Sequence, residues 1–444
     1  MKKGKIKAVR GSLLWFTGNP FVTPQSDCVT YEEDGLLIIQ DGHIQASGAS
    51  ANLLPVLDRD VTVEHYPDHI IMPGFIDAHT HYAQMQIIGA YGKQLLDWLN
   101  DYTFIAEQAF DDGAHAAAMA DFFCQELLRR GTTTAAVYCT VHPQSVDALF
   151  EAATQRNMRM IGGKVMMDRN APEALLDTPQ LAYDQSKALI ERWHEKGRNH
   201  YALTPRFAPC CSMEQLDMAG RLRGEFDRLY VQSHLSENEA EVNWAGELFP
   251  ERSGYLDVYN HHGLTGQYSL YGHAIHLTAA EWQDVRDRGT GIVHCPTSNL
   301  FLGSGLFNLG AAMGGPDPVN LSIGTDVGAG TSLSMLTTLG EAYKVAHLKG
   351  YSLNAFQAFY LATLGGARAL SLDHLIGSLD VGKEADFIVL DKKSTPLMAK
   401  RMDRVSSIEE ALFVLMTMGD DRAIAASYIF GQKCHSRAEG QANE

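Results

Sequence analysis

Apolar and polar residues alternate over short stretches at both ends of the chain, a pattern typical of half-buried β-strands. Near the N-terminus the stretches 35–40 and 43–48 are joined by Asp41-Gly42, a strong hairpin signal. The same strand and turn pattern returns at 377–391 and 423–430. We therefore expect residues 1–68 and 376–444 to meet in one small β-sandwich domain.

The middle of the chain alternates strand-like and helix-like segments instead. Helical spacing of apolar residues predicts helices near 114–130, 145–156, 182–196 and 213–228. Apolar or β-branched runs predict strands at 71–81, 132–138, 159–167, 201–207, 229–234, 268–273, 291–295 and 320–326. Eight strands alternating with helices imply an α/β fold, a closed (β/α)8 TIM barrel over residues 69–375.

Composition narrows the class of protein. The 444 residues are 45% hydrophobic and 20% charged, which is ordinary for a soluble globular enzyme. A formal net charge of −17 repels nucleic acid phosphates and anionic lipid, so we expect neither as a partner. No apolar run is long enough for a bilayer span and no signal-peptide core follows the basic N-terminus, so we expect a cytoplasmic protein. The seven cysteines contain no Cys-x-x-Cys pair and read as reduced thiols.

Candidate chemistry gathers at the ends of the predicted strands. His79 and His81 share one face of the first strand and end it, although such a pair can also be two polar residues on a half-buried strand. His234, His273 and Asp326 end the fifth, sixth and eighth strands. A single strand-end histidine is more often a hydrogen-bonding residue than a ligand, but coincidence at four strand ends is much less expected. Because strand ends meet at the catalytic mouth of such a barrel, imidazoles and a carboxylate there indicate an open catalytic zinc site.

The sequence resembles the amidohydrolase superfamily and, within it, the guanine deaminase family. The superfamily motifs are 73–81 (PGFIDAHTH) with His234, His273 and Asp326, and the more specific ones are 81–84 (HYAQ), 205–207 (PRF), 234–238 (HLSEN), 294–299 (HCPTSN) and 324–330 (GTDVGAG). The resemblance covers nearly the whole chain and implies hydrolysis of guanine to xanthine and ammonia. It also implies one zinc ion per chain, or iron in its place, held by His79, His81, His234 and Asp326.

Catalytic roles follow from residue type and from the resemblance together. Glu237, three residues after His234, is placed to act as general acid/base, although a carboxylate there could also be a solvated residue at a helix start. Asp326 can bind the metal and accept a proton from the attacking water. His273 can orient that water and stabilise developing charge.

Recognition of the base is expected from three residues. Gln84 both donates and accepts hydrogen bonds and Arg206 only donates, which suits a purine edge bearing a carbonyl. Phe207 could stack on the base. The assignment of these residues to guanine binding, with His234 and Asp326 beside the base, rests on the resemblance.

Several alternatives bear on these expectations. Lys164 lies on the third strand, whereas two-metal relatives carry a carbamylated lysine on the fourth, so one metal is expected. The His-x-Glu and Pro-Cys-x-x-Cys signature of a second zinc deaminase design is missing from the sequence. A sibling barrel hydrolase acting on another purine, a pyrimidine or a triazine remains open, as does a barrel that binds without catalysis. A homodimer is expected from the resemblance alone.

Overall fold

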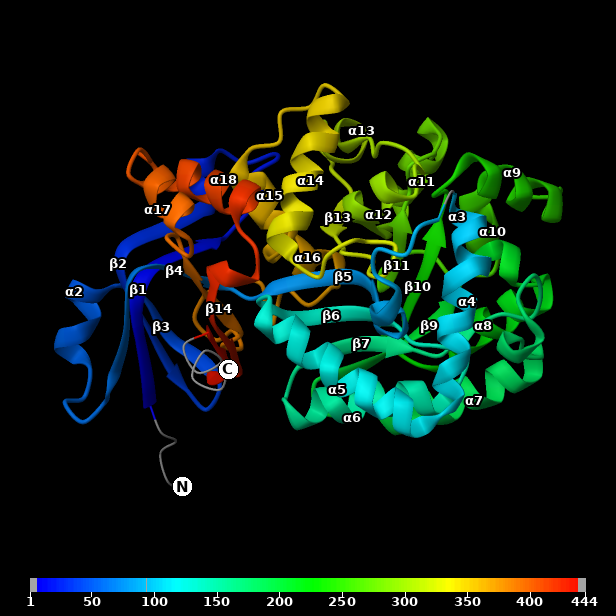
Figure 1. Ribbon diagram of the computed structural model, residues 1–444, viewed down its shortest axis with the longest axis horizontal. Coiled ribbons are helices and arrows are strands. Elements are labelled where there is room, and N and C mark those ends of the chain that lie inside the picture. Colours follow the sequence, from blue (N-terminus) through cyan, green and yellow to red (C-terminus); the bar gives the residue numbers. More distant parts are fainter. Residues whose placement is uncertain (1–5, 93, 438–444) are drawn as a thin grey trace.

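The chain forms a parallel α/β barrel with a second, separate β-sheet beside it (Figure 1). The structure is a computed structural model that describes residues 6–92 and 94–437. Figure 1 shows the first and last parts of the chain, blue and red, lying together on one side of the barrel. The fold class predicted from the pattern of strands and helices is thus confirmed.

Eight positions around the barrel are taken by parallel strands in sequence order. Their bounds are β5 (Phe75–His81), β6 (Thr132–Tyr138), β7 (Arg159–Gly163) continued by the short β8 (Val165–Met166), β9 (Asn199–Pro205), β10 (Tyr230–Leu235), β11 (Ser269–His273), β12 (Gly291–His294) and β13 (Asn320–Ile323). Two backbone hydrogen bonds join the first strand to the segment after the last, from Asp326 N–H to the His79 carbonyl at 2.8 Å and from His81 N–H to the Val327 carbonyl at 2.7 Å. These bonds tie the ends of the barrel together at its carboxyl mouth.

Helices follow the strands and cover the outside of the barrel (Figure 1). They are α5 (Gly113–Arg129), α6 (Pro143–Gln155), α7 (Pro179–Trp193), α8 (Met213–Glu225), α9 (Glu239–Leu248), α10 (Tyr255–His261), α11 (Ala279–Arg288), α12 (Pro296–Phe301), α13 (Leu309–Met313), α14 (Met335–Leu348), α15 (Ala355–Leu361) and α16 (Leu364–Ala369). Side-chain caps fix several starts, as at Thr178, whose hydroxyl accepts from Leu181 N–H before α7. Among the described residues, no helix combines the length and the apolar character that crossing a bilayer requires.

The connection between β5 and α5 is long and carries helical turns of its own. These are the 3₁₀ segment η2 (Tyr82–Ile87), α3 (Leu95–Trp98), the π-helical η3 (Leu99–Thr103), α4 (Phe104–Gln108) and η4 (Ala109–Asp111). Because loops that follow barrel strands surround the mouth, this insertion is positioned to wall a site there.

Both ends of the chain build the second sheet, which has the strand order β16-β15-β14-β4-β1-β2-β3. Its strands are β1 (Ile6–Phe16), β2 (Val29–Gln40), β3 (His43–Ala49), β4 (Val63–Pro73), β14 (Phe387–Asp391), β15 (Ile424–Ile429) and β16 (Gln432–Ser436). Gln40 pairs with His43 across the predicted Asp41-Gly42 turn, where both residues have positive φ as a type I′ turn requires. The hairpin is thus confirmed.

The predicted strand 71–81 is in fact two strands in two sheets. Residues 71–73 end β4, which pairs with β1 and β14, and β5 starts at Phe75. Gly74 separates them, and a Cβ added there would lie 2.1 Å from Thr133 Oγ1, so a side chain would not fit. The expectation of one continuous strand was wrong because alternation of apolar residues does not reveal a change of sheet.

A buried ion network joins the barrel to the sheet. Glu384 accepts from Arg159 Nη2 at 2.7 Å through each carboxylate oxygen and from Arg198 Nη2 at 2.5 Å. Arg198 also pairs with Asp386.

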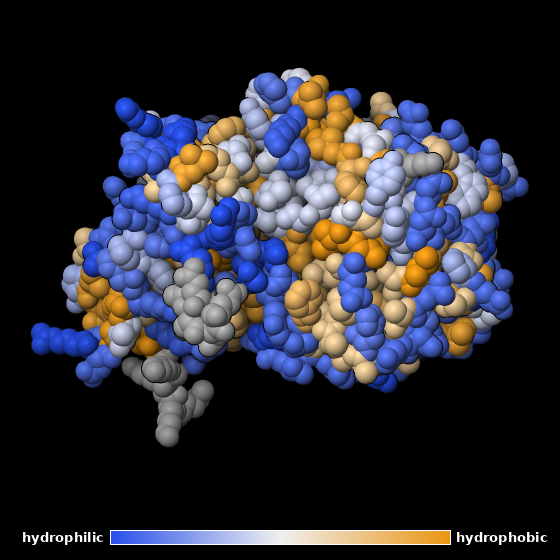
Figure 2. Space-filling model, in the orientation of Figure 1, coloured by the Kyte–Doolittle hydropathy of each residue, from blue (hydrophilic) through white to orange (hydrophobic). Residues whose placement is uncertain are grey.

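The outer face in view is mostly hydrophilic, in keeping with the charged composition (Figure 2).

Candidate active site

Four of the five predicted strand-end residues lie on barrel strands, and one lies beyond its strand. His79 and His81 lie on β5, His234 lies on β10 and His273 is the last residue of β11. Asp326 follows β13, which ends at Ile323, so the expected strand to residue 326 is three residues too long. His273 and Asp326 have positive φ values of 73° and 50°. Such backbone conformations are uncommon outside glycine and cluster at functional sites.

The structure brings these five side chains together at the barrel mouth. His79 Nε2 lies 3.3 Å and His81 Nε2 lies 3.1 Å from Asp326 Oδ1. One ligand atom each from His79, His234, His273 and Asp326 lies within 4.8 Å of the other three. Two atoms that bind one zinc ion tetrahedrally at about 2.0–2.1 Å are separated by about 3.3 Å. The spacing of the two β5 histidines from Asp326 therefore fits a shared ion.

Polar atoms in this cluster lack protein partners. His79 Nε2, His81 Nδ1 and His273 Nε2 are buried and have no hydrogen-bond partner among the described residues. His234 Nδ1–H donates to the Arg206 carbonyl at 2.7 Å, which turns Nε2 of His234 away from that bond. Because buried nitrogens without partners are costly, the cluster fits a bound cation.

Burial sets the charge of the cluster. It lowers the pKa of His81 to about 4 and that of His234 well below the usual value, so both imidazoles are neutral at pH 7, as metal binding requires. Burial alone would raise the pKa of Asp326, but the electrostatic interaction with His79 and hydrogen bonding with His79 and His81 hold this pKa well below its usual value. The donor set is therefore neutral imidazoles with one carboxylate.

Glu237 lies between β10 and α9, on the side of the cluster where His273 lies. Its Oε2 is 3.6 Å from His273 Nε2, which is also 3.6 Å from Asp326 Oδ2. Its Oε1 accepts from Ser304 Oγ at 3.0 Å. Burial and then the negative charge of Asp326 raise the pKa of Glu237 to about 8, so this carboxyl can hold a proton at neutral pH.

Glu241 fixes the loop that carries Glu237, and sequence reasoning missed it. Its Oε2 accepts from the backbone N–H of Glu237 at 2.9 Å and of Asn238 at 3.1 Å, and its Oε1 accepts from Tyr255 OH at 2.6 Å. Asn238 and Glu241 form a capping box at the start of α9. That spacing is readable in the sequence and could have found Glu241.

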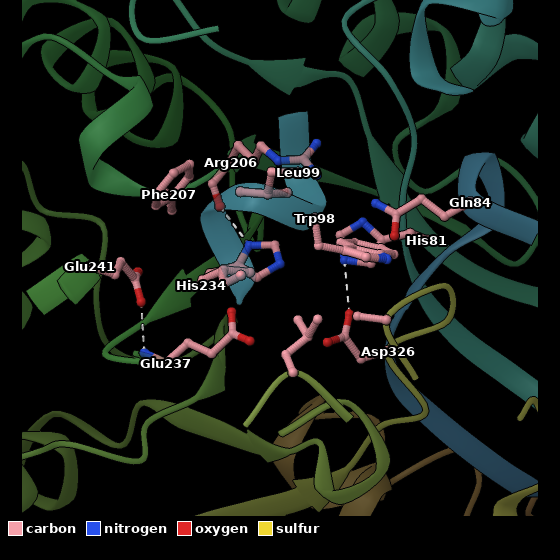
Figure 3. A pocket seen from close by; sticks show the side chains of 13 residues that line it. His81, Gln84, Trp98, Leu99, Arg206, Phe207, His234, Glu237, Glu241 and Asp326 are labelled. Atoms are coloured by element: carbon pink, nitrogen blue, oxygen red, sulfur yellow. Dashed lines mark hydrogen bonds and ion pairs between the residues drawn. The ribbon is translucent and has the colours of Figure 1, made fainter. Parts of the chain in front are cut away.

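A pocket opens beside the cluster (Figure 3), and the empty space within it and at its mouth is about 400 Å³ with open solvent included. Its lining includes the predicted His81, Gln84, Arg206, Phe207, His234, Glu237 and Asp326, together with Leu95, Trp98, Leu99, Glu241, Leu302 and Ala329. Figure 3 shows Glu237 and Asp326 below His234, and Arg206 and Phe207 above it. Apolar walls with a few polar groups suit a small planar ligand.

Glu107 is a second buried carboxylate that sequence reasoning missed. It accepts from Arg206 Nη1 at 2.8 and 2.7 Å and from Gln84 Nε2 at 3.0 Å. These partners lie 99 and 23 residues away along the chain, and no local spacing signals the contact. Glu107 lies on α4, in the insertion after β5.

Lys164 has a different environment. It forms a buried ion pair with Asp177 and is not among the residues that line the cavity. Burial lowers its pKa, and Asp177 opposes that effect. A buried ion pair away from the cavity is typical of a structural residue.

The barrel and its His/Asp cluster define a metal-dependent hydrolase of the barrel type. The chain belongs to the amidohydrolase family, whose model matches residues 70–432. Members of this family depend on a metal, and the cluster of His and Asp side chains could hold one.

Known proteins match over nearly the full length. The chain is 51% identical over 434 residues to guanine deaminase of Escherichia coli (strain K12), covering 97% of this chain and 98% of the relative. The solved structure of E. coli guanine deaminase covers 97% of this chain and 100% of that one, with a TM-score of 0.94 and 51% identity. Guanine deaminase from C. acetobutylicum with bound guanine covers 97% and 100%, with a TM-score of 0.86 and 29% identity. The resemblance seen in the sequence motifs is confirmed.

Proposed function

We propose that the chain catalyses the hydrolytic deamination of guanine to xanthine and ammonia. The observation that carries the proposal is 51% identity over 97% of the chain to a guanine deaminase. The cavity supports it, because Gln84, Arg206 and Phe207 line the same small space as the His/Asp cluster.

We assign one zinc ion per chain, with iron as the alternative, to His79, His81, His234 and Asp326. Both β5 histidines lie near Oδ1 of Asp326, while His273 lies nearer Oδ2. This division favours Oδ1 as the atom that would bind the ion, and it would leave Oδ2 and His273 to act on the attacking water. A bound divalent cation of this kind supplies Lewis acidity that makes water nucleophilic at neutral pH.

The side chains around the cluster divide the proton transfers. Water oxygen adds to C2 of the purine while Asp326 Oδ2 accepts a proton from that water and His273 stabilises the developing charge. Glu237, protonated because of its raised pKa, donates to the ring nitrogen beside C2. Glu237 next passes the proton held by Asp326 to the amine, so that the C2–N bond breaks and ammonia leaves. The hydroxyl group left on C2 then gives its proton to Glu237 and becomes the new carbonyl of xanthine, which returns both carboxyl groups to their starting states.

Binding of the base falls to the opposite side of the cavity. Arg206 and Gln84 provide hydrogen-bond donors for the carbonyl edge, and the Phe207 ring offers an apolar face. His234 and Asp326 lie beside the reacting carbon in this arrangement. The planar ring is then held with C2 toward the cluster.

Substrate turnover by the purified, zinc-loaded chain tests the proposal. We expect guanine to yield equimolar xanthine and ammonia, with far slower turnover of adenine, cytosine and a triazine. Ammonia from one of those three compounds but not from guanine would favour a sibling amidohydrolase. Guanine binding without ammonia release would favour a barrel that binds without catalysis.

A homodimer located in the cytoplasm completes the proposal. The homodimer rests on the resemblance alone. Light scattering on the purified chain tests the homodimer, and cell fractionation tests the location.

A further inference from the structure

We propose that Glu107 is a specificity-determining positioning residue that fixes which hydrogen-bond donors the cavity presents to the base. The inference rests on the proposed function, because it concerns how a purine with a 6-oxo group is distinguished from one with a 6-amino group. It is carried by the contacts of Glu107 with both polar residues of the base-binding side.

The first contact orients Arg206. Both oxygens of Glu107 accept from the same nitrogen, Nη1, at 2.8 and 2.7 Å, and the two side chains are 3% and 1% exposed. The Phe104 ring also lies against the guanidinium, at 5.5 Å from its carbon. Among the described residues, the guanidinium of Arg206 donates side-chain hydrogen bonds only from Nη1. Its Nε–H and Nη2–H groups remain available to a ligand.

The second contact fixes the amide of Gln84. Its Nε2 donates to Glu107 at 3.0 Å while its Oε1 accepts from Gly328 N–H at 3.1 Å. Turning the amide over would set Oε1 against the carboxylate and Nε2 against the backbone N–H. Both hydrogen bonds would become repulsive contacts in a buried site, so the amide is held in one orientation.

The consequence is a fixed pattern of donors. Arg206 and the second N–H of Gln84 are hydrogen-bond donors. A 6-oxo group of a purine can accept from them, whereas a 6-amino group would place its own N–H donors against these donors. A site that is built to hydrogen-bond a particular polar group strongly rejects analogues that lack this group, because the buried polar groups of the site are then left without a partner. The carboxylate acts on the substrate only through Arg206 and Gln84.

Replacing Glu107 by glutamine disrupts this pattern with little change in volume. One acceptor oxygen becomes an NH2 group, which must then face either a donor of Arg206 or a donor of Gln84. The guanidinium also loses the anion that pairs it in a buried place. The Gln84 amide becomes free to turn, and selectivity for the oxo group falls.

The experiment compares guanine with 2,6-diaminopurine, which has the same C2 amine but an amino group at C6. For Glu107→Gln we expect KM for guanine to rise about tenfold or more, since charged hydrogen bonds are lost, with kcat reduced less than about threefold. The guanine preference in kcat/KM should narrow about tenfold, with zinc content unchanged. Glu107→Asp, which keeps the charge, should restore part of the preference.

Ile105→Gln is the matched control, because Ile105 is on the same short helix and is 63% exposed. It should keep both the wild-type KM and the wild-type preference. Unchanged preference in both Glu107 variants would overturn the inference while leaving the proposed function intact. A parallel loss of kcat for both substrates with loss of zinc would also overturn it, in favour of a purely structural role. Failure of the wild-type chain to deaminate guanine would instead overturn the proposed function itself.

Discussion

Glu237→Gln is expected to abolish most turnover without releasing the metal. The carboxyl is 2% exposed, its Oε2 lies 3.6 Å from His273 Nε2, and the proposed ligands do not include it. Glutamine keeps the volume and can still accept the Ser304 hydrogen bond through its amide oxygen. It cannot carry a proton to the ring or to the amine. General acid/base catalysis contributes roughly 100- to 10,000-fold, so we expect kcat to fall by that factor, equivalent to about 3 to 5 kcal/mol in the barrier.

The assay is ammonia release under saturating guanine, with zinc measured on the same preparation. Glu239→Gln is the matched control, since Glu239 is an exposed carboxylate at the start of α9 on the same segment. The control should retain kcat within about twofold, because it removes only a solvated charge near a helix N-terminus. A Glu237→Gln protein with full zinc and wild-type kcat would remove Glu237 from the mechanism. Loss of zinc along with turnover would show that the residue holds the site together instead.

Three further outcomes follow from the structure. Chelation should remove about one zinc ion per chain and lower the Tm, and addition of one equivalent of zinc should restore the bound metal and the Tm. Two tightly bound ions per chain would contradict a single site. Glu384→Gln should lower the free energy of unfolding in urea by about 3 to 5 kcal/mol, because buried Arg159 loses its anion and buried Arg198 keeps only Asp386, whereas Arg10→Gln at an exposed ion pair should change it by less than about 1 kcal/mol. Chelated protein should lose stability as pH rises from about 5 to 8, because the pKa of Glu237 is raised to about 8 in the folded state and unfolding releases its proton in that range. Glu237→Gln should make the fall of unfolding free energy with pH shallower by up to about 1.4 kcal/mol per pH unit. An identical pH dependence in both proteins would refute this origin.

Local pattern predicted the barrel strands well because burial on both faces leaves apolar and β-branched runs in the sequence. The expected strand 132–138 coincides with β6 (Thr132–Tyr138). The mouth could be predicted for the same reason, since parallel strands of a barrel deliver their ends to one face. The start of α7 was placed three residues late, although Thr178 and Pro179 carry a capping signal.

Contacts between distant segments could not be predicted in the same way. Glu107 meets Arg206 only because the insertion after β5 folds back over the mouth. Nothing in the sequence near Glu107 differs from an ordinary helical glutamate. The break at Gly74 is hidden likewise, because strands of two sheets follow one another with one residue between them.

The placement of Gln84 links the proposed metal site to the proposed recognition of the base. β5 ends at His81, and Gln84 lies three residues on in η2, where its amide bonds to Gly328 in the loop that also carries Asp326. The two loops are further joined by the hydrogen bonds between His79, His81 and the segment 326–327. A shift of either loop would therefore move a proposed metal ligand and the proposed base-binding residue Gln84 together. In the proposed arrangement these backbone hydrogen bonds hold the two loops at a fixed spacing, Glu241 holds the backbone of the Glu237 loop, and Glu107 orients the side chains of Arg206 and Gln84.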